Sequence, residues 1–419
     1  MKRGVEDRIK TDLAQKMVLL SGPRQVGKTT LAKALYPGNS EYFNMDSVEH
    51  RLLIQKQAWR RDCDLVIFDE LHKVRKWKNW IKGIFDTEGV RPRLLVTGSS
   101  RLDVYRKGGD SLAGRFYSYR LHPFSVAEVK EKYTVDAALE HIMRFGGFPE
   151  PFLKGSEKDA KRWRRSHVNR ILREDLLDIA SVRNLRSMET LVELLRNSVG
   201  STISYESLAR DLQVSPHTVK QWIGMLEGLY ILFVVTPYHR NIARGLIKQP
   251  KIYFYDTGFV KEDEGARFEN AVACALLKRL HFLEDTAGEK CALHYVRDKE
   301  KREVDFLTVR DGRAEWLVET KLADTEIAFL KHFFGFFVNP VRKDGALNPA
   351  LSKKKKVSMD SPRKRPKVLR GSSQPQGVEP SNGVKETKPI LLVKNLKREL
   401  FLDGIHVKKA GTWLQSLEA

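Results

Sequence analysis

An eight-residue stretch near the amino terminus constrains this chain more than any other feature. Residues 22–29 have the sequence Gly-Pro-Arg-Gln-Val-Gly-Lys-Thr, which is a complete Walker A pattern. An apolar run, 17–20, precedes it, and a helix-prone stretch, 31–35, follows it. Strand, loop and helix in this order turn backbone N–H groups toward phosphate oxygens, at the positive end of the helix dipole. The sequence therefore predicts a nucleotide-binding α/β fold.

The residue types in this loop have separate chemical roles. Gly22 and Gly27 supply backbone freedom that a side chain would block. Lys28 is expected to reach the outer phosphates of ATP, and the Thr29 hydroxyl to ligate Mg²⁺. The predicted ATP-binding residues are Gly22, Pro23, Arg24, Gln25, Val26, Gly27, Lys28, Thr29 and Thr30.

Two further apolar runs end in residues that suit ATP hydrolysis. Residues 65–68 are apolar throughout, as in a strand buried on both faces of a parallel sheet, and lead into Asp69 and Glu70. Asp69 is expected to hold the Mg²⁺ shell, and Glu70 to orient or deprotonate the attacking water. The run 93–96 leads to Ser99, for which a water-positioning role and a simple turn serine are both open.

Length and composition bound the class of protein. The 419 residues allow two or three domains, and no apolar run approaches the roughly 18 residues needed to span a bilayer. The start, residues 1–7, has no apolar signal core, and Cys63, Cys274 and Cys291 form no Cys-x-x-Cys pair. We therefore expect a cytoplasmic protein with no membrane partner, no zinc site and no disulfide framework.

The net charge of +22 favours a polyanionic partner, DNA above all, over a merely solvated surface. Residues 340–389 hold thirteen Lys or Arg and four Asp or Glu, a net +9 that leaves +13 for the rest. Their Lys-, Arg-, Pro-, Ser- and Gly-rich composition cannot bury enough apolar surface to fold. We predict a disordered basic insertion at about 340–389 that acts as an electrostatic tail rather than as a nuclear import signal.

Apolar patterns divide the chain into four predicted parts. Residues 1–122 alternate five strand candidates with helices, as in a parallel sheet wrapped by helices. Residues 123–200 are predicted to be a helical lid, interrupted by Gly-Gly-Phe-Pro at 146–149. Residues 201–260 and 261–419 form the third and fourth parts.

The third part has the element order of a winged helix. Two short helices, 204–212 and 218–226, precede strand-like segments that flank a basic loop. The second helix offers only His217, Lys220 and Gln221 as polar readers of a major groove. DNA binding and a dimerisation or packing role are equally compatible with this pattern.

The fourth part has the predicted order helix, three strands, helix and strand, with the basic insertion before the last strand. Residues 311–313, Asp-Gly-Arg, predict a hairpin turn between the second and third strands. If this loop closes symmetrically, paired positions sum to 624, so Asp305 faces Glu319 and Lys321 points the same way as Glu319.

Two facing carboxylates form a hard-oxygen site for Mg²⁺. Glu269, on the preceding helix, would add a third carboxylate, and Lys321 would steady or activate the attacking water. Asp305, Glu319 and Lys321 resemble the D…E-x-K pattern of PD-(D/E)XK nucleases. An active site, an inactive relic and a chance pairing on a solvated face are all open at this point.

Taken together, the motifs resemble bacterial and archaeal AAA+ superfamily predicted ATPases with a C-terminal domain of unknown function. The resemblance rests on residues 21–30, 69–73, 97–100, 111–115 and 146–149, and covers nearly the whole chain except about 340–389. It implies ATP binding and hydrolysis at Lys28, Thr29, Asp69 and Glu70, and it makes Arg115 a candidate arginine finger. It also implies a C-terminal winged helix followed by a restriction-nuclease-like fold.

The predicted fold class is α/β: a P-loop AAA+ type parallel sheet with a helical lid, then a winged helix and an α/β restriction-nuclease-like domain. The predicted function is a Mg²⁺-dependent ATPase associated with DNA, with a homo-oligomer as a further expectation because arginine fingers usually come from a neighbouring subunit. The alternative is a nucleotide-gated DNA-binding or assembly module with slow hydrolysis and a degenerate nuclease fold. A metabolic kinase is disfavoured, because no small-molecule pocket motif follows the loop.

Overall fold

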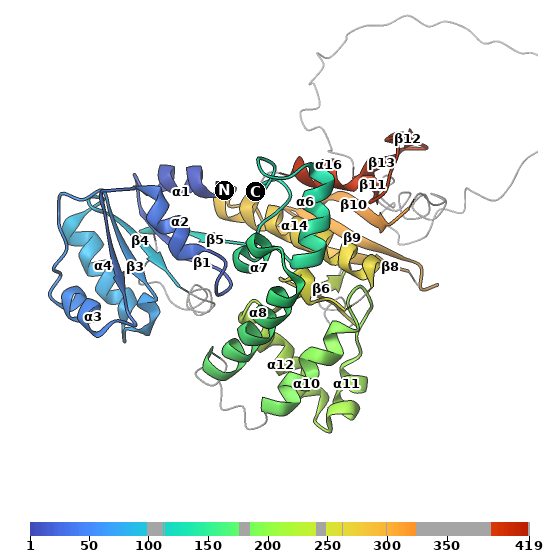
Figure 1. The fold of residues 1–419 in the computed structure, drawn as a ribbon, viewed down its shortest axis with the longest axis horizontal. Helices are drawn as coiled ribbons and strands as arrows, with labels where there is room; N and C mark the ends of the chain where they lie inside the picture. The colour runs from blue at the N-terminus through green and yellow to red at the C-terminus, as the bar shows by residue number, and fades with distance from the viewer. Residues whose placement is uncertain are drawn as a thin grey trace, which may run out of the picture.

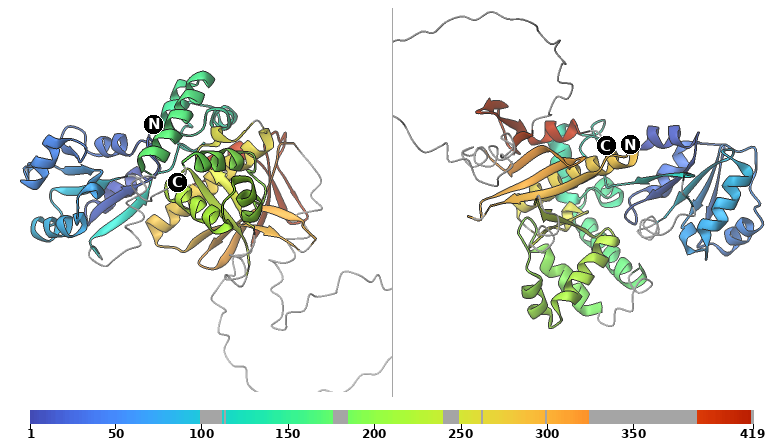
Figure 2. Two further views of the ribbon diagram at one scale, coloured as in Figure 1. Left: turned by 90° about the horizontal axis from the view of Figure 1, so that it is seen from below. Right: turned by 180° about the vertical axis from the view of Figure 1, so that it is seen from behind.

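The computed structural model describes residues 1–98, 112, 114–175, 185–239, 249–261, 263–298, 300–323 and 387–417. Ser99, the basic loop at 240–248, the helix predicted at 324–337 and the basic segment up to residue 386 lie outside the described residues. The chain contains two sheets, one in its amino-terminal third and a larger one in its carboxyl-terminal part, at opposite ends of the molecule (Figures 1 and 2).

The amino-terminal sheet confirms the five predicted strands. All pair in parallel, in the order β2-β3-β4-β1-β5. Every residue of β1 and β3 is buried, because helices cover both faces of these central strands. The strands are β1 Met17–Ser21, β2 Ser40–Asn44, β3 Leu65–Asp69, β4 Arg93–Thr97 and β5 Phe116–Arg120.

Alternation along β1 divides the core of this part in two. Val18 and Leu20 pack with the apolar side chains of α1 and α2, whereas Met17 and Leu19 pack with those of α3 and α4. Each face of the sheet is therefore covered by helices, as the alternating pattern predicts. The elements are α1 Glu6–Asp12, α2 Lys28–Leu35, α3 Val48–Gln55, η1 Leu71–Lys73 and α4 Trp77–Glu88.

The segment predicted as a helical lid contains helices from residue 135 onward, after a stretch of turns at 123–134. The Gly-Gly-Phe-Pro turn separates two helices as expected, since Gly146 ends one with a φ of 77° and Pro149 is the first residue of the next. The elements are α6 Val135–Phe145, α7 Pro149–Lys154, α8 Glu157–Arg170, the π-helical turn η3 Ile171–Asp175 and α10 Leu185–Arg196.

Two capped helices and a hairpin follow. Ser204 and Ser215 cap α11 (Tyr205–Leu212) and α12 (Pro216–Gly228) through their side-chain oxygens. Strands β6 (Leu232–Pro237) and β7 (Lys251–Phe254) pair in antiparallel fashion. This hairpin is continuous with the larger sheet, because β6 also pairs in parallel with β8 (Cys291–Arg297).

The larger sheet has eight strands among the described residues, in the order β12-β13-β11-β10-β9-β8-β6-β7. The long helix α14, Glu264–Ala287, packs against it (Figure 1). Strand β11 begins at Lys388, two residues before the predicted start of the closing strand at Ile390. The elements not yet named are η4 Thr257–Phe259, β9 Glu303–Arg310, β10 Arg313–Lys321, β11 Lys388–Val393, β12 Leu400–Leu402, β13 Ile405–Lys409 and α16 Ala410–Gln415.

The β9–β10 turn differs from the predicted three-residue loop. Arg310 pairs with Arg313, so the turn consists of Asp311 and Gly312, whose φ angles of 46° and 75° suit a two-residue hairpin with positive φ at both positions. A bulge at Glu315 then shifts the register, and Trp316 pairs with Thr308. Beyond the bulge, paired positions sum to 624 as predicted, although for a different reason.

Helix α14 also connects the two sheets. Arg120 of β5 forms ion pairs with Asp285 at 2.7 Å and Glu284 at 2.6 Å. Glu128 is buried and binds Lys278 at 2.6 Å and Arg3 at 3.2 Å. Buried ion pairs of this kind require defined geometry, so α14 and the amino-terminal sheet are held in one orientation.

Candidate functional site

The loop of residues 22–29 surrounds the ammonium group of Lys28. Lys28 Nζ donates to the carbonyl oxygens of Gly22 at 2.9 Å and Pro23 at 2.7 Å. Gly22 has a φ of 140°, and a Cβ at this position would lie 2.4 Å from Leu121 O, so the loop needs glycine here. Gly27, with a φ of 99°, precedes the first residue of α2. The loop therefore presents the start of α2 in the geometry that suits an anion.

Three hydroxyl groups converge on Asp69 at the carboxyl end of β3. Its Oδ2 accepts from Thr29 Oγ1 at 2.9 Å and from Tyr42 OH at 2.7 Å, and its Oδ1 accepts from Thr97 Oγ1. Burial, followed by the contact with Asp69, raises the pKa of Tyr42, so this hydroxyl remains a donor. Thr29 and Asp69, which were each predicted to serve a Mg²⁺ ion, are thus in direct contact. Sequence reasoning missed Tyr42 and Thr97, although both stand on predicted strands beside β3.

Glu70 has a backbone and an environment unlike those of its neighbour. Its φ is 57°, and its Oε2 has no hydrogen-bond partner, with His72 Nε2 at 3.5 Å and Lys73 Nζ at 4.0 Å. Burial raises the pKa of Glu70, and the nearby Lys28 and Lys73 oppose this effect. A buried carboxylate with a raised pKa and an unused oxygen is suited to accept a proton.

Two residues from outside the phosphate-binding loop, Arg3 and His167, contact it. Arg3 is buried and donates to Val26 O at 3.0 Å. His167 of α8 places its Nδ1 3.0 Å from Gln25 Oε1 and stacks on Trp163 with ring centroids 4.4 Å apart. Burial, with smaller contributions from Arg170, Arg24 and Lys28, lowers the pKa of His167 to about 3. The ring is therefore neutral near pH 7, and α8 contacts the loop directly.

Arg115 lies far from the nucleotide loop of its own chain. It precedes Phe116, which pairs with Met17 at the amino end of β1, whereas the loop follows Ser21 at the carboxyl end. Five strand residues separate the two ends, roughly 17 Å. Arg115 donates Nε to Asp86 Oδ1 at 2.6 Å and Nη2 to Asp86 Oδ2 at 3.1 Å. The predicted finger is thus positioned away from its own ATP site.

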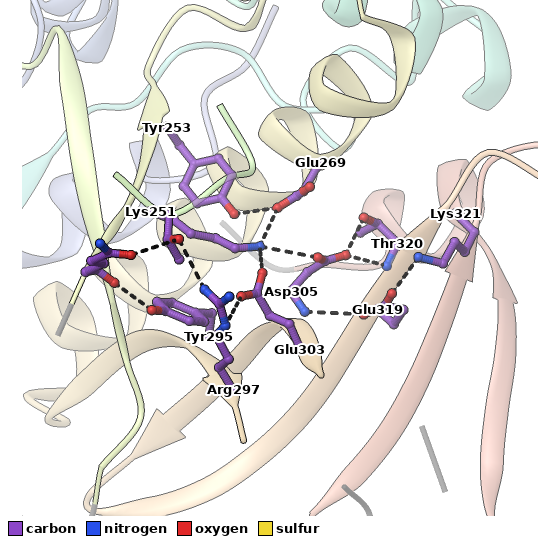
Figure 3. A network of polar contacts seen from close by, with 12 residues as sticks. Lys251, Tyr253, Glu269, Tyr295, Arg297, Glu303, Asp305, Glu319, Thr320 and Lys321 are labelled. Atoms are coloured by element: carbon purple, nitrogen blue, oxygen red, sulfur yellow. Dashed lines mark hydrogen bonds and ion pairs between the residues drawn. The ribbon is translucent and has the colours of Figure 1, made fainter. Parts of the chain in front are cut away.

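The second predicted site does come together. Figure 3 shows Asp305 and Glu319 on neighbouring strands, with Glu269 reaching in from α14. The N–H of Asp305 donates to Glu319 Oε2 at 3.3 Å, and Lys321 Nζ donates to Glu319 Oε1 at 2.6 Å. Asp305 Oδ2 accepts from the N–H of Thr320 at 2.9 Å and from its hydroxyl at 2.7 Å.

A lysine that sequence reasoning did not select stands among these carboxylates. Lys251 of β7 is 1% exposed, and its Nζ lies 2.7 Å from Glu303 Oε1, 3.1 Å from Glu269 Oε1 and 3.5 Å from Asp305 Oδ1. Tyr253, also on β7, donates to Glu269 Oε1 at 2.6 Å. We call Glu269, Glu303, Asp305 and Glu319 the carboxylate cluster. A signal was available, since Lys251 and Tyr253 point to the same face of a predicted strand.

The electrostatics of the carboxylate cluster reflect burial more than metal affinity. Burial, then repulsion from Asp305, raises the pKa of Glu269 to about 7 and that of Glu319 to about 8. Among the described residues, no group of three or more His, Cys, Asp or Glu side chains is arranged to hold a metal ion. Lys251 therefore supplies the positive charge in this arrangement, at the place where the sequence predicted a metal.

Comparison with known proteins divides the chain into three stretches. Residues 14–130 match the family described as an AAA domain. Residues 136–264 match a domain of unknown function (DUF8612), and residues 264–348 match a second domain of unknown function (DUF4143). Within the ranges that the structure describes, no helix combines the length and apolar character needed to cross a membrane.

The relatives are themselves uncharacterised. One from Mycobacterium tuberculosis and one from Mycobacterium bovis are each 26% identical over 306 residues, covering 71% of this chain and 68% of the relative. One from Methanocaldococcus jannaschii is 25% identical over 272 residues, covering 59% of each chain.

Solved structures give a weaker likeness. RuvB of Thermotoga maritima is 18% identical, covers 58% of this chain and 93% of its own, and has a TM-score of 0.30. A DNA polymerase III gamma subunit-related protein of the same organism is 10% identical, covers 54% and 76%, and has a TM-score of 0.25. With TM-scores this low, neither structure supports a conclusion about this chain. The match over residues 14–130 supports an AAA-type, ATP-binding amino-terminal domain.

Proposed function

We propose that this protein is a Mg²⁺-dependent ATPase whose nucleotide site lies between the phosphate-binding loop and the carboxyl ends of β3 and β4. The observation that carries the proposal is the convergence of Thr29, Tyr42 and Thr97 on Asp69, directly beside Glu70. A single carboxylate fixed by three hydroxyls next to a second, partly unsatisfied carboxylate is an arrangement suited to hydrolysis rather than to structural support.

The residues fit a magnesium ion. Thr29 Oγ1 and Asp69 Oδ2 are hard oxygen atoms 2.9 Å apart beside the loop, which is the kind of ligand that Mg²⁺ prefers. Bound Mg²⁺ would neutralise charge on the phosphates. Thr29 would ligate it directly, and Asp69, oriented by Tyr42 and Thr97, would hold its water shell.

The chain's own side chains supply the remaining steps. On binding, Lys28 would exchange the Gly22 and Pro23 carbonyls for the outer phosphates of ATP. Glu70 would orient the attacking water and accept its proton at the oxygen that has no hydrogen-bond partner. Arg115 would act on the ATP of a neighbouring subunit in a homo-oligomer, because it stands at the opposite end of its own sheet.

For the carboxyl-terminal part we propose a winged helix joined to a PD-(D/E)XK nuclease-like sheet that associates with DNA but does not cleave it. The element order and the convergence of Asp305, Glu319 and Lys321 support the nuclease-like fold. Lys251 disfavours activity, because its ammonium group neutralises the carboxylates that a metal would need. The nucleotide-gated DNA-binding module is therefore the better description of this half. The domain limits we propose are 1–122, 123–200, 201–260 and 261–419.

ATP turnover of two variants tests the nucleotide site. Lys28→Ala should lose nucleotide binding, whereas Glu70→Gln should bind a fluorescent ATP analogue like the parent and lose hydrolysis by roughly 10²-fold or more. Parent-like ATP turnover by Glu70→Gln would contradict the proposed role of Glu70 in activating the attacking water. ATP turnover measured with and without DNA then tests whether DNA association is coupled to hydrolysis. Equal rates in both conditions would show that it is not.

A further inference from the structure

A basic cleft lies between the helical segment and the beginning of α14. Its volume is about 1090 Å³, and its walls come from α6, α8, η3, α10, η4 and the first turn of α14. Eight of the eighteen lining residues are Lys or Arg and three are Glu, which gives the wall a net charge of +5. A low-dielectric recess lined by one sign of charge concentrates ions of the opposite sign.

Three cations stand on the outer face of α8, and Lys161 among them interacts at longer range with Glu157. Lys161 and Arg165 line the cleft, and Arg162 lines a hollow beside it. All three side chains are exposed, and none lies within ion-pair distance of a carboxylate in the described parts of the chain. Other cations of the cleft differ, since Arg144 and Arg196 pair with Glu157 and Glu193. Lys161 and Arg165 are therefore cleft cations of α8 that form no close ion pair among the described residues.

The spacing of these charges suits a phosphate backbone. Lys161 and Arg165 are four residues apart on one helix face, roughly 6 Å along the axis. Two cations this close together on one helix face can contact neighbouring phosphates of one strand. Asn169, one further turn along the same face, adds a neutral hydrogen-bonding group to the wall of the cleft.

Arg164 forms part of the inner wall of the cleft. It is 8% exposed, and its Nε donates to Asp256 Oδ2 at 2.7 Å. Its Nη2 is buried without a hydrogen-bond partner. Gly258 makes room for this guanidinium, since a Cβ there would lie 1.8 Å from Nη2. This packing fixes Arg164 in the inner wall of the cleft, with its charge balanced by Asp256.

The inner face of the same helix contacts the nucleotide site. His167 is two residues beyond Arg165, is buried, and reaches Gln25 of the phosphate-binding loop. Helix α8 thus has cations on its outer face and a direct contact to the ATP loop on its inner face. A ligand that moves α8 would change the position of Gln25.

We propose that the basic cleft binds the phosphate backbone of a nucleic acid, with Lys161 and Arg165 as phosphate contacts, and that α8 transmits this binding to the phosphate-binding loop. The proposal rests on the nucleic-acid association proposed above and assigns it to α8 rather than to α12. It also predicts recognition without sequence preference, because the cleft offers charge but few groups for reading bases.

The test compares charge reversals at two places on the surface. Lys161→Glu/Arg165→Glu removes the cations of α8. Arg51→Glu/Lys56→Glu makes the same change in net charge at two exposed residues, one in α3 and one directly after it, on the face of the amino-terminal sheet opposite to α2. Binding of fluorescein-labelled single-stranded DNA, duplex DNA and single-stranded RNA would be followed by fluorescence anisotropy over a range of salt concentrations.

We expect the α8 variant to bind its nucleic acid roughly tenfold or more weakly than the parent, with a salt dependence reduced by roughly two phosphate contacts, and the α3 variant to bind like the parent. The preferred strand type identifies the source of the phosphates. The milder Lys161→Ala/Arg165→Ala variant should also bind more weakly than the parent. An unchanged melting temperature in this variant would show that the weaker binding does not come from misfolding.

Two results would overturn the proposal and differ from one another. Parent-like binding by both α8 variants, with loss in His217→Ala/Lys220→Ala of α12, would leave nucleic-acid association intact and place it on α12. Absence of binding by the parent to all three nucleic acids would remove the association itself. Normal ATP turnover by the α8 variant without nucleic acid is expected, because neither residue contacts the ATP site.

Discussion

Replacing Lys251 by methionine removes the only cation within 3.5 Å of Glu269, Glu303 and Asp305 in the described contacts. Methionine keeps the volume and the apolar stem but not the charge. Glu269 and Asp305 would then lose their nearest counter-ion and keep the more distant charge of Lys321. Burial, and then repulsion from Asp305, already raises the pKa of Glu269 to about 7, and the loss of Lys251 would remove one of the groups that oppose this shift.

The expected magnitude follows from the burial of Lys251. Its side chain is 1% exposed, and breaking a buried ion pair costs about 3–5 kcal/mol because the remaining charge has no partner. With about 2–4 °C for each kcal/mol in a domain of this size, we expect the melting temperature to fall by roughly 6–20 °C. Lys408→Met on the same sheet is the matched control. Lys408 and Glu399 form an exposed pair at 2.8 Å, and its loss should cost about 1 kcal/mol or less.

The loss of stability in Lys251→Met should also depend on pH. A carboxyl group whose folded pKa is raised stabilises the fold when protonated, and this contribution is lost as pH rises through the folded value. Removing Lys251 raises the pKa of Glu269 further. The deficit of Lys251→Met should therefore be larger at about pH 8.5 than at about pH 6, where protonation relieves the repulsion.

Calorimetry of the full chain, with and without Mn²⁺, measures these effects together. Mn²⁺ should raise the melting temperature of Lys251→Met, because the vacated position is surrounded by hard oxygen ligands, and should not raise that of the parent. An unchanged melting temperature in Lys251→Met would refute the ion-pair account. Stabilisation of the parent by Mn²⁺ that Asp305→Asn abolishes would instead show a metal site in the native protein.

Three further outcomes are expected. Arg115→Ala should bind ATP like the parent but lose most hydrolysis, since fingers contribute roughly 10³ to 10⁵ in rate, and mixing it with Lys28→Ala should restore part of the turnover in a demonstrated mixed oligomer. His167 has a folded pKa of about 3, so it destabilises the fold as pH falls below about 6.5, and His167→Gln should reduce the loss between about pH 6.5 and pH 5 by about 2 kcal/mol in acid-unfolding measurements. Gly22→Ala should abolish ATP binding through the close approach to Leu121 O, as equilibrium titration with a fluorescent analogue would show.

The sequence predicted the amino-terminal sheet well because each signal there is local. A strand buried on both faces is a continuous apolar run, and the loop carries its own motif, so β1, β3 and the roles suggested for Lys28 and Asp69 follow from short segments. The partners of Asp69 are not local. Tyr42 and Thr97 meet it only because β2 and β4 flank β3, an order that strand patterns alone do not specify.

In the carboxyl-terminal part, the predicted pairing register was correct although the predicted turn was wrong. Asp305 stands beside Glu319 because a two-residue turn and a bulge at Glu315 together produce the register that a three-residue loop was expected to give. Strands β12 and β13 and helix α16 were not predicted, since they are short and follow the basic segment. A bulge has no reliable sequence signal when its residue is a glutamate held by Arg279 and Arg310.

The proposed loss of cleavage activity depends on Lys251. The D…E-x-K pattern concerns Asp305, Glu319 and Lys321, which the hairpin brings together by itself. The ammonium group that neutralises the cluster arrives from β7, a strand that pairs with β6 at the other end of the sheet order. Its partner β6 follows α12 along the chain. The charge balance of the cluster therefore depends on the position of the β6–β7 hairpin. Any movement of the hairpin that withdraws Lys251 would leave carboxylates able to take a divalent cation, and the Mn²⁺ response of Lys251→Met measures that state directly.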